Sequence, residues 1–162
     1  MTWSANEVQA LAAKAARGGG APAGQAASFG RAAVIHLCAD RPADDLISAL
    51  GALPEGPIMS LPLALAQVLE TTQCRGPVRC ASAALAQSYC ETLPFAHEIS
   101  LTPDGMDLCI ELTRPGTRRP VKRVALPADL IALLDDLASR ILVPESDASR
   151  RGGAGAGLTD ND

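Results

Sequence analysis

Cations and glycines gather near the start of the chain, a combination that suits the binding of an anion. Gly18, Gly19 and Gly20 follow a segment with helical periodicity. Backbone N–H groups at the start of a helix attract negative charge, and nearby cations add to that attraction. We therefore predict an anion site formed by Lys14, Arg17, Gly19, Gly20 and Arg31. A structural interpretation is also open, because glycine ends helices and basic residues in a last turn complement the helix dipole.

A phosphate-binding loop of the nucleoside-triphosphatase type is excluded. Gly19 and Gly24 have the spacing of its two glycines, but Gln25 and Ala26 follow where the loop needs Lys and then Ser or Thr. That loop also follows a strand, whereas the residues before Gly19 have helical periodicity. The sequence lacks both the lysine for the phosphates and the hydroxyl for magnesium.

A second group of residues could act as acid, base or nucleophile in a small metabolic enzyme. His97 and Glu98 form one pair of such groups, and Tyr89 and Cys90 form another. Neighbouring residues of a strand point to opposite sides, so His97 and Glu98 would not share a pocket. A reactive cysteine needs an electropositive, partly exposed setting, and nothing in the sequence places Cys90 in one. Enzymatic function is therefore the alternative prediction.

The sequence predicts no metal site and no cofactor. Its two histidines, His36 and His97, are not accompanied by a CxxC or HxxxH pattern, and zinc needs three or four ligands at such spacings. The five cysteines lie among apolar neighbours, which in a reducing compartment is typical of small buried side chains. They are Cys38, Cys74, Cys80, Cys90 and Cys109.

The charge of the chain argues against nucleic acid as a partner. The formal net charge is −4 and the isoelectric point is about 5.1, whereas nucleic-acid binders normally carry a basic excess. A local basic run has no aromatic residue that could stack on a base, and we interpret it as a solvated loop. It comprises Arg114, Arg118, Arg119, Lys122 and Arg123. The chain has no apolar run of the ~20 residues that a membrane span needs and no signal peptide, so we expect a cytoplasmic protein.

Helical patterns dominate the first part of the chain. Ser4 and Glu7 fit a capping box at the start of the first helix. Gly30, inside the second helix, costs about 1 kcal/mol relative to alanine, and a close helix–helix crossing would explain it. The predicted helices cover residues 4–17, 22–39, 42–50, 61–71 and 81–93, with a turn at Gly76-Pro77 between the last two.

After Pro94 the pattern changes from helical to alternating. Apolar residues alternate with polar ones on both sides of the turn sequence Thr102-Pro103-Asp104-Gly105, which predicts a β-hairpin. The alternating residues are Ile99, Leu101, Met106, Leu108, Ile110 and Leu112. Residues 121–126 are the predicted third strand, and a last helix begins at Pro127.

The predicted fold class is α+β, with an N-terminal portion of four to five helices followed by a small antiparallel sheet with a C-terminal helix. Residues 1–143 form one predicted globular domain, and the glycine-rich residues 144–162 form a predicted disordered tail. One strand of such a sheet is an exposed edge, to which a second copy could pair. A homodimer is therefore a hypothesis to be tested.

The first 37 residues carry a pattern shared with a known family. The pattern consists of Asn6-Glu7-Val8, Ala10-Leu11, Lys14-Ala15-Ala16-Arg17-Gly18, Gly24, Ala26 and Gly30-Arg31-Ala32. It resembles a family of uncharacterised bacterial proteins, domain-of-unknown-function family 3726. Members carry an aromatic residue before the position of Gly24 and an acidic pair before that of Gly30, whereas this chain has Ala23 and Ala27-Ser28. The resemblance implies one bacterial domain and supplies no activity.

These patterns favour a non-catalytic binding or accessory protein. Its partner would be a small anionic metabolite or a partner enzyme. The prediction depends on the glycine run with Lys14, Arg17 and Arg31, and on the lack of catalytic groups that converge. The alternative is a small metabolic enzyme that uses His97 and Glu98, or Tyr89 and Cys90.

Overall fold

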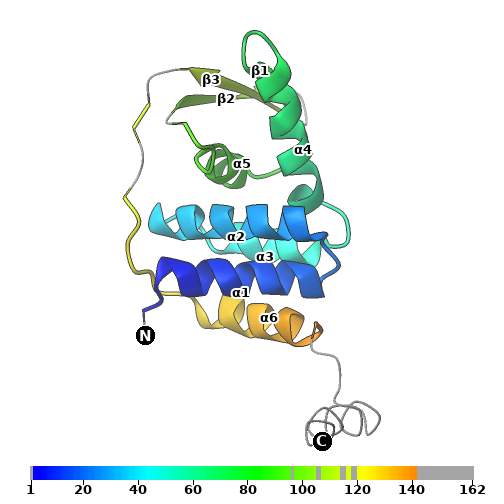
Figure 1. The fold of residues 1–162 in the computed structure, drawn as a ribbon, viewed down its shortest axis with the longest axis vertical. Helices are drawn as coiled ribbons and strands as arrows, with labels where there is room; N and C mark the ends of the chain where they lie inside the picture. The colour runs from blue at the N-terminus through cyan, green and yellow to red at the C-terminus, as the bar shows by residue number, and fades with distance from the viewer. Residues whose placement is uncertain (1, 96, 105–106, 114–115, 118–119, 142–162) are drawn as a thin grey trace, which may run out of the picture.

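The helices and the sheet form the α+β arrangement that the sequence predicts (Figure 1). The structure is a computed structural model, and it describes residues 2–141 except 96, 105–106, 114–115 and 118–119. Within these residues there are six helices and one three-stranded antiparallel sheet. The predicted tail, residues 144–162, lies outside the described residues.

The first helix, α1 (Ala5–Gly18), begins at the predicted capping box. The Ser4 N–H donates to the Glu7 carboxylate at 2.6 Å, and the Glu7 N–H donates to the Ser4 hydroxyl at 3.4 Å. These hydrogen bonds from Ser4 lower the pKa of Glu7. The buried face of α1 carries Val8, Ala12, Ala15 and Ala16. Because these side chains are small, α1 can approach its neighbours closely.

The second helix, α2 (Ala23–Cys38), crosses α1 at Gly30. A Cβ at position 30 would lie 2.6 Å from the Gln9 carbonyl oxygen and 3.1 Å from the Ala13 Cβ. The predicted close crossing is therefore confirmed, and the side chain that glycine lacks is what allows it. Phe29, next to the crossing, is fully buried.

The helices stack in layers below and beside the sheet (Figure 1). α1 lies between α2 and α6 (Ala128–Ser139), and α5 (Ala83–Cys90) lies between α2 and the sheet. α3 (Asp44–Gly51) follows α2, and α4 (Pro57–Glu70) leads from α3 up to the first strand. The apolar core runs through these layers, from Leu130, Leu134 and Leu137 on the buried face of α6 to Ile110 in the sheet.

The sheet has the strand order β1-β3-β2. Strands β2 (Glu98–Asp104) and β3 (Asp107–Thr113) form the predicted hairpin, with Leu101 opposite Ile110. The turn was predicted too early, because Thr102, Pro103 and Asp104 pair with β3 as part of β2. Gly105 and Met106, which connect these strands, lie outside the described residues. β2 and β1 (Arg75–Val78) are the two edges of the sheet.

The prediction of the third strand was wrong. Residues 121–126 contribute only an isolated bridge between Val124 and Trp3, closed by hydrogen bonds of 2.8 and 3.0 Å. The third strand is β1, in the segment where the sequence predicted a turn at Gly76-Pro77. Proline is tolerated in an edge strand, because its missing N–H can face away from the ladder. The pairing with β3 and the burial of Val78 outweigh the local turn preference.

Candidate functional site

The backbone donors of the glycine run are already used. The Gly19 N–H donates to the Ala15 carbonyl at 2.9 Å, and the Gly20 N–H donates to the Arg17 carbonyl at 3.0 Å. Both bonds satisfy carbonyl groups at the end of α1, as in a glycine C-cap. The expectation that these two N–H groups point freely at an anion was therefore wrong.

Packing explains why glycine occupies this run. A Cβ at Gly18 would collide with the Leu137 carbonyl oxygen of α6, and a Cβ at Gly19 would lie 2.6 Å from the Leu53 side chain. Gly20 has a φ of +101°, a backbone conformation that glycine adopts without strain. The run ends α1 and lets α6 and the loop after α3 approach it.

Of the predicted anion-binding residues, the structure places Arg31 beside a cavity. Lys14 and Arg17 are exposed on α1, and neither lines either of two cavities found among the described residues. Gly19 and Gly20 are also absent from the walls of both cavities. Arg31 does line one of them, and the other four members of the predicted set line neither.

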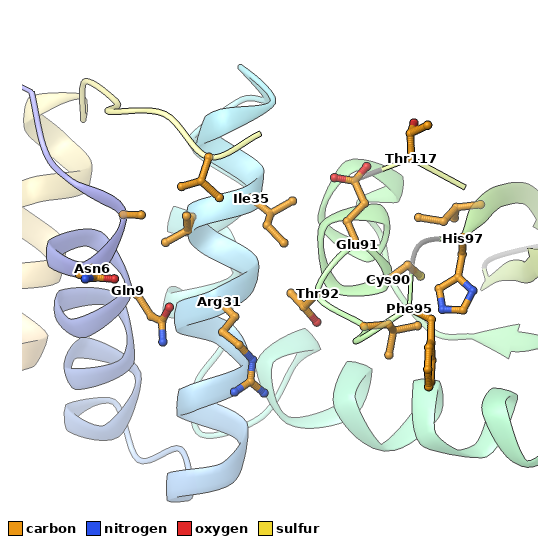
Figure 2. A pocket seen from close by; sticks show the side chains of 15 residues that line it. Asn6, Gln9, Arg31, Ile35, Cys90, Glu91, Thr92, Phe95, His97 and Thr117 are labelled. Carbon is orange, nitrogen blue, oxygen red and sulfur yellow. The ribbon is translucent and has the colours of Figure 1, made fainter. Parts of the chain in front are cut away.

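That cavity has a volume of about 390 Å³. Its walls come from α1, α2, the end of α5, the start of β2 and the segment after β3 (Figure 2). Beside it, Gly116 lies directly against the backbone of His97 and has no room for a Cβ. We call this space the Arg31 cavity.

One wall of the Arg31 cavity carries polar side chains from α1 and α2. They are Asn6, Gln9 and Arg31, which flank the crossing at Gly30 (Figure 2). The Arg31 guanidinium donates to the Ser28 hydroxyl at 3.3 Å. The described residues place no carboxylate in ion-pair contact with Arg31, so its charge is directed to the solvent and the cavity.

The opposite wall carries Glu91, whose charge is already paired. The Arg41 guanidinium donates to the Glu91 carboxylate at 2.6 Å and to the Ser88 hydroxyl at 2.7 Å. Both side chains of the ion pair are largely buried, which makes the contact stronger than one at an exposed surface. The pair fixes the position of Glu91 in the cavity wall.

His36 extends this network into the core. Its Nδ1 lies 2.9 Å from the Ser88 hydroxyl, and its Nε2 lies 2.8 Å from the Pro42 carbonyl oxygen. Burial lowers the pKa of His36, and the nearby Arg41 lowers it further, against the opposing effects of the Pro42 carbonyl and Asp45. A neutral imidazole with its proton on Nε2 donates to the Pro42 carbonyl. The Ser88 hydroxyl accepts from Arg41, and its single proton lies within reach of both His36 Nδ1 and the Ala84 carbonyl. His36 therefore joins α2 to α5 as a structural residue.

Two of the predicted catalytic residues reach the Arg31 cavity. Cys90 and His97 both line it, whereas Glu98 is exposed on β2 and Tyr89 lines neither cavity (Figure 2). Cys90 is fully buried, and burial raises the pKa of its thiol to about 12. Burial also raises the pKa of Tyr89. A cysteine attacks as its thiolate, and a thiol with so high a pKa stays protonated at neutral pH. The raised pKa of Cys90 therefore argues against its use as a nucleophile.

The sequence reasoning missed the apolar part of the cavity. Phe95 is 57% exposed and Val121 is 61% exposed, and both line it. The Phe95 and His97 rings meet edge to face, with ring centres 6.2 Å apart. Large apolar side chains next to Pro94 and Pro120, in loops, were the available signal, because loops position many binding residues.

The second cavity has a volume of about 540 Å³ and lies between α3 and the amino ends of α4 and α5. None of the predicted site residues lines it. Two hydroxyls in its wall already serve the helix ends. Ser60 donates to the Gly56 carbonyl, and Ser82 accepts from the Leu85 N–H. This leaves fewer groups to recognise a ligand than the Arg31 cavity offers.

The cysteines and the basic run are dispersed. Cys38, Cys80 and Cys90 are buried, while Cys74 and Cys109 are half-buried. In the basic run, Lys122 pairs with Asp40 at 2.7 Å and Arg123 donates to Thr2. The other members, Arg114, Arg118 and Arg119, lie outside the described residues.

Two searches of the described residues gave no result. No group of three or more His, Cys, Asp or Glu side chains is placed to hold a metal ion. Among the same residues, no helix combines the length and the apolar character needed to cross a membrane.

The comparison with protein-family models found no match for the chain. The comparisons with curated proteins and with solved structures found none either. The resemblance of the first 37 residues to family 3726 therefore stays a prediction, and the site is interpreted from its own chemistry.

Proposed function

We propose that this chain is a non-catalytic binding protein that holds a small anionic metabolite in the Arg31 cavity. The observation that carries the proposal is the Arg31 guanidinium, which lines a cavity of about 390 Å³ with no carboxylate paired to it among the described residues. Cavities of this size hold small molecules, and a few polar groups set the orientation of the ligand in them. Relative to the predicted site, the proposal keeps Arg31 and moves the ligand away from the glycine run.

The charges around the cavity support an anion over a cation. Glu91 could attract a cation, but Arg41 already neutralises it at 2.6 Å. Arg31 retains donors that its single hydrogen bond to Ser28 does not use. Gln9 lies beside it in the same wall and can donate through its amide (Figure 2). An anion placed here gains hydrogen bonds from a charged donor, which are stronger than neutral ones.

The test is a thermal-shift screen of carboxylates and phosphates, followed by calorimetry on two variants. A ligand at 100 times its dissociation constant stabilises the native state by about 2.7 kcal/mol. Arg31→Gln should weaken the binding of a hit about tenfold or more, because it removes a charged hydrogen bond. Arg17→Gln removes an exposed cation outside the cavity and should leave the affinity unchanged. If Arg17→Gln weakens binding and Arg31→Gln does not, the anion binds elsewhere.

Enzymatic use of the same cavity is the second candidate, because Cys90 and His97 both line it. Because burial raises the pKa of Cys90, His97 is the candidate acid or base of this cavity. Turnover of a bound ligand that disappears in His97→Gln, with binding retained, would support this candidate. A partner enzyme as the ligand, and residence in the cytoplasm, remain further proposals.

A further inference from the structure

We infer that the ligand of the Arg31 cavity is a monocarboxylate with an apolar, preferably aromatic, body. This inference rests on the proposed function and specifies its ligand. Its carboxylate would face Arg31 and Gln9, and its apolar body would lie against Phe95 and the neighbouring apolar wall (Figure 2).

The charges of the lining limit the ligand to one negative charge. Arg31 is the cation among the described residues that line the cavity, and Glu91 stands in the opposite wall. A second anionic group at the far end of the ligand would find no further arginine or lysine among the described lining residues, because Glu91 in that wall already holds Arg41 in an ion pair. A phosphate monoester carries a charge of about −1.5 to −2 at neutral pH, and a dicarboxylate carries two charges. A single carboxylate matches one guanidinium in both charge and geometry.

The exposed apolar side chains define the rest of the ligand. Phe95 and Val121 keep more than half of their surface exposed, and the half-buried Ile35, Leu93 and Ile99 line the same space. Removing such surface from water favours association. The ring of Phe95 meets His97 edge to face, at an interplanar angle of 76°. This contact orients Phe95 so that an aromatic ligand can pack on it.

The experiment uses the full chain and isothermal titration calorimetry with a matched series of probes. Benzoate, phenylacetate and 3-phenylpropanoate differ by single methylenes, and each buried methylene should tighten binding about fourfold. Three further probes each remove one proposed feature. Propanoate lacks the ring, 3-phenylpropanamide lacks the charge, and phenylsuccinate adds a second charge. Each should bind at least about tenfold more weakly than 3-phenylpropanoate.

Two variants locate the apolar contact. Phe95→Ser should weaken 3-phenylpropanoate and leave propanoate unchanged, because only the ring loses its partner. Leu63→Ser is the control, since Leu63 is 58% exposed on α4 and lies outside the cavity lining. It should leave all affinities unchanged. Both residues are largely exposed, so both variants should fold.

The outcomes separate this inference from the proposed function. If propanoate and phenylsuccinate bind as tightly as 3-phenylpropanoate, and Arg31→Gln weakens them, an anion site exists but the ligand class is wrong. If 3-phenylpropanamide binds as tightly as the acid, the anion is not recognised and both proposals fail. If none of these probes binds at millimolar concentration, the ligand class is rejected, and the phosphates of the thermal-shift screen decide the proposed function.

Discussion

Alanine at Gly30 should destabilise the protein, although alanine is the better helix former. Gly30 lies where α1 and α2 cross, and a Cβ there would be 2.6 Å from the Gln9 carbonyl oxygen. This neighbour is backbone, so the clash is relieved only if the helices move apart. Overpacking of this kind costs about 1–3 kcal/mol.

The net change in the free energy of unfolding follows from two opposing contributions, and Gly24→Ala provides a control in the same helix. Replacing glycine by alanine in a helix gains up to about 1 kcal/mol. Because the obstacle is backbone, we place the clash at about 2–3 kcal/mol, which leaves a net loss of about 1–2 kcal/mol. For a chain of this length the midpoint should fall by about 2–8 °C. Gly24 lies in the same helix and a Cβ there meets nothing within 4 Å, so Gly24→Ala should keep or raise the midpoint.

Urea unfolding followed by circular dichroism measures both variants. The reasoning predicts a lower midpoint concentration for Gly30→Ala, with an unchanged slope, and no loss for Gly24→Ala. Equal stability of the two variants would refute the close crossing. Gln9 lines the Arg31 cavity, so Gly30→Ala should also weaken ligand binding by displacing that wall.

Three further predictions concern the core, the thiols and the assembly. The native pKa of His36 lies below its unfolded value near 6.5, so the unfolded chain binds the extra proton first and stability falls as the pH drops below about 6.5. The pH dependence of urea unfolding should be weaker in His36→Gln, and an unchanged slope would contradict a neutral native imidazole. In the native protein, a thiol reagent such as Ellman's reagent should label the half-buried Cys74 and Cys109 quickly and the buried Cys38, Cys80 and Cys90 only on unfolding; rapid labelling of Cys90 would contradict its burial. If a second copy pairs at a strand edge, sedimentation should show a dimer at high concentration, whereas only monomer would remove that hypothesis.

The sequence predicted the elements whose signals are local. Short sequence patterns predicted the capping box of Ser4 and Glu7 and the hairpin, and both are confirmed. A glycine inside a helical pattern predicted the close crossing at Gly30, which is also confirmed. β1 was missed because its pairing with β3 joins residues 30 to 36 positions apart. Its local sequence, Gly76-Pro77, has the opposite preference.

The site was only partly predictable for the same reason. Arg31 was singled out for its charge and grouped with the glycine run, whereas the structure places it at a cavity and uses Gly18 and Gly19 for contacts with Leu137 and Leu53. The Arg41–Glu91 pair and the Ser88–His36 contact each join residues about 50 positions apart. No local pattern marks such contacts. They become visible only when α2 and α5 are packed together.

The most direct test of the account is where an anionic ligand binds. A ¹H–¹⁵N NMR titration of the labelled chain with 3-phenylpropanoate would report each backbone amide separately. We expect the largest shifts at Arg31, Ile35, Cys90, Phe95 and Ile99, which line the cavity, and loss of these shifts in Arg31→Gln. Shifts centred on Gly18 to Gly24 would contradict the account and return the site to the glycine run.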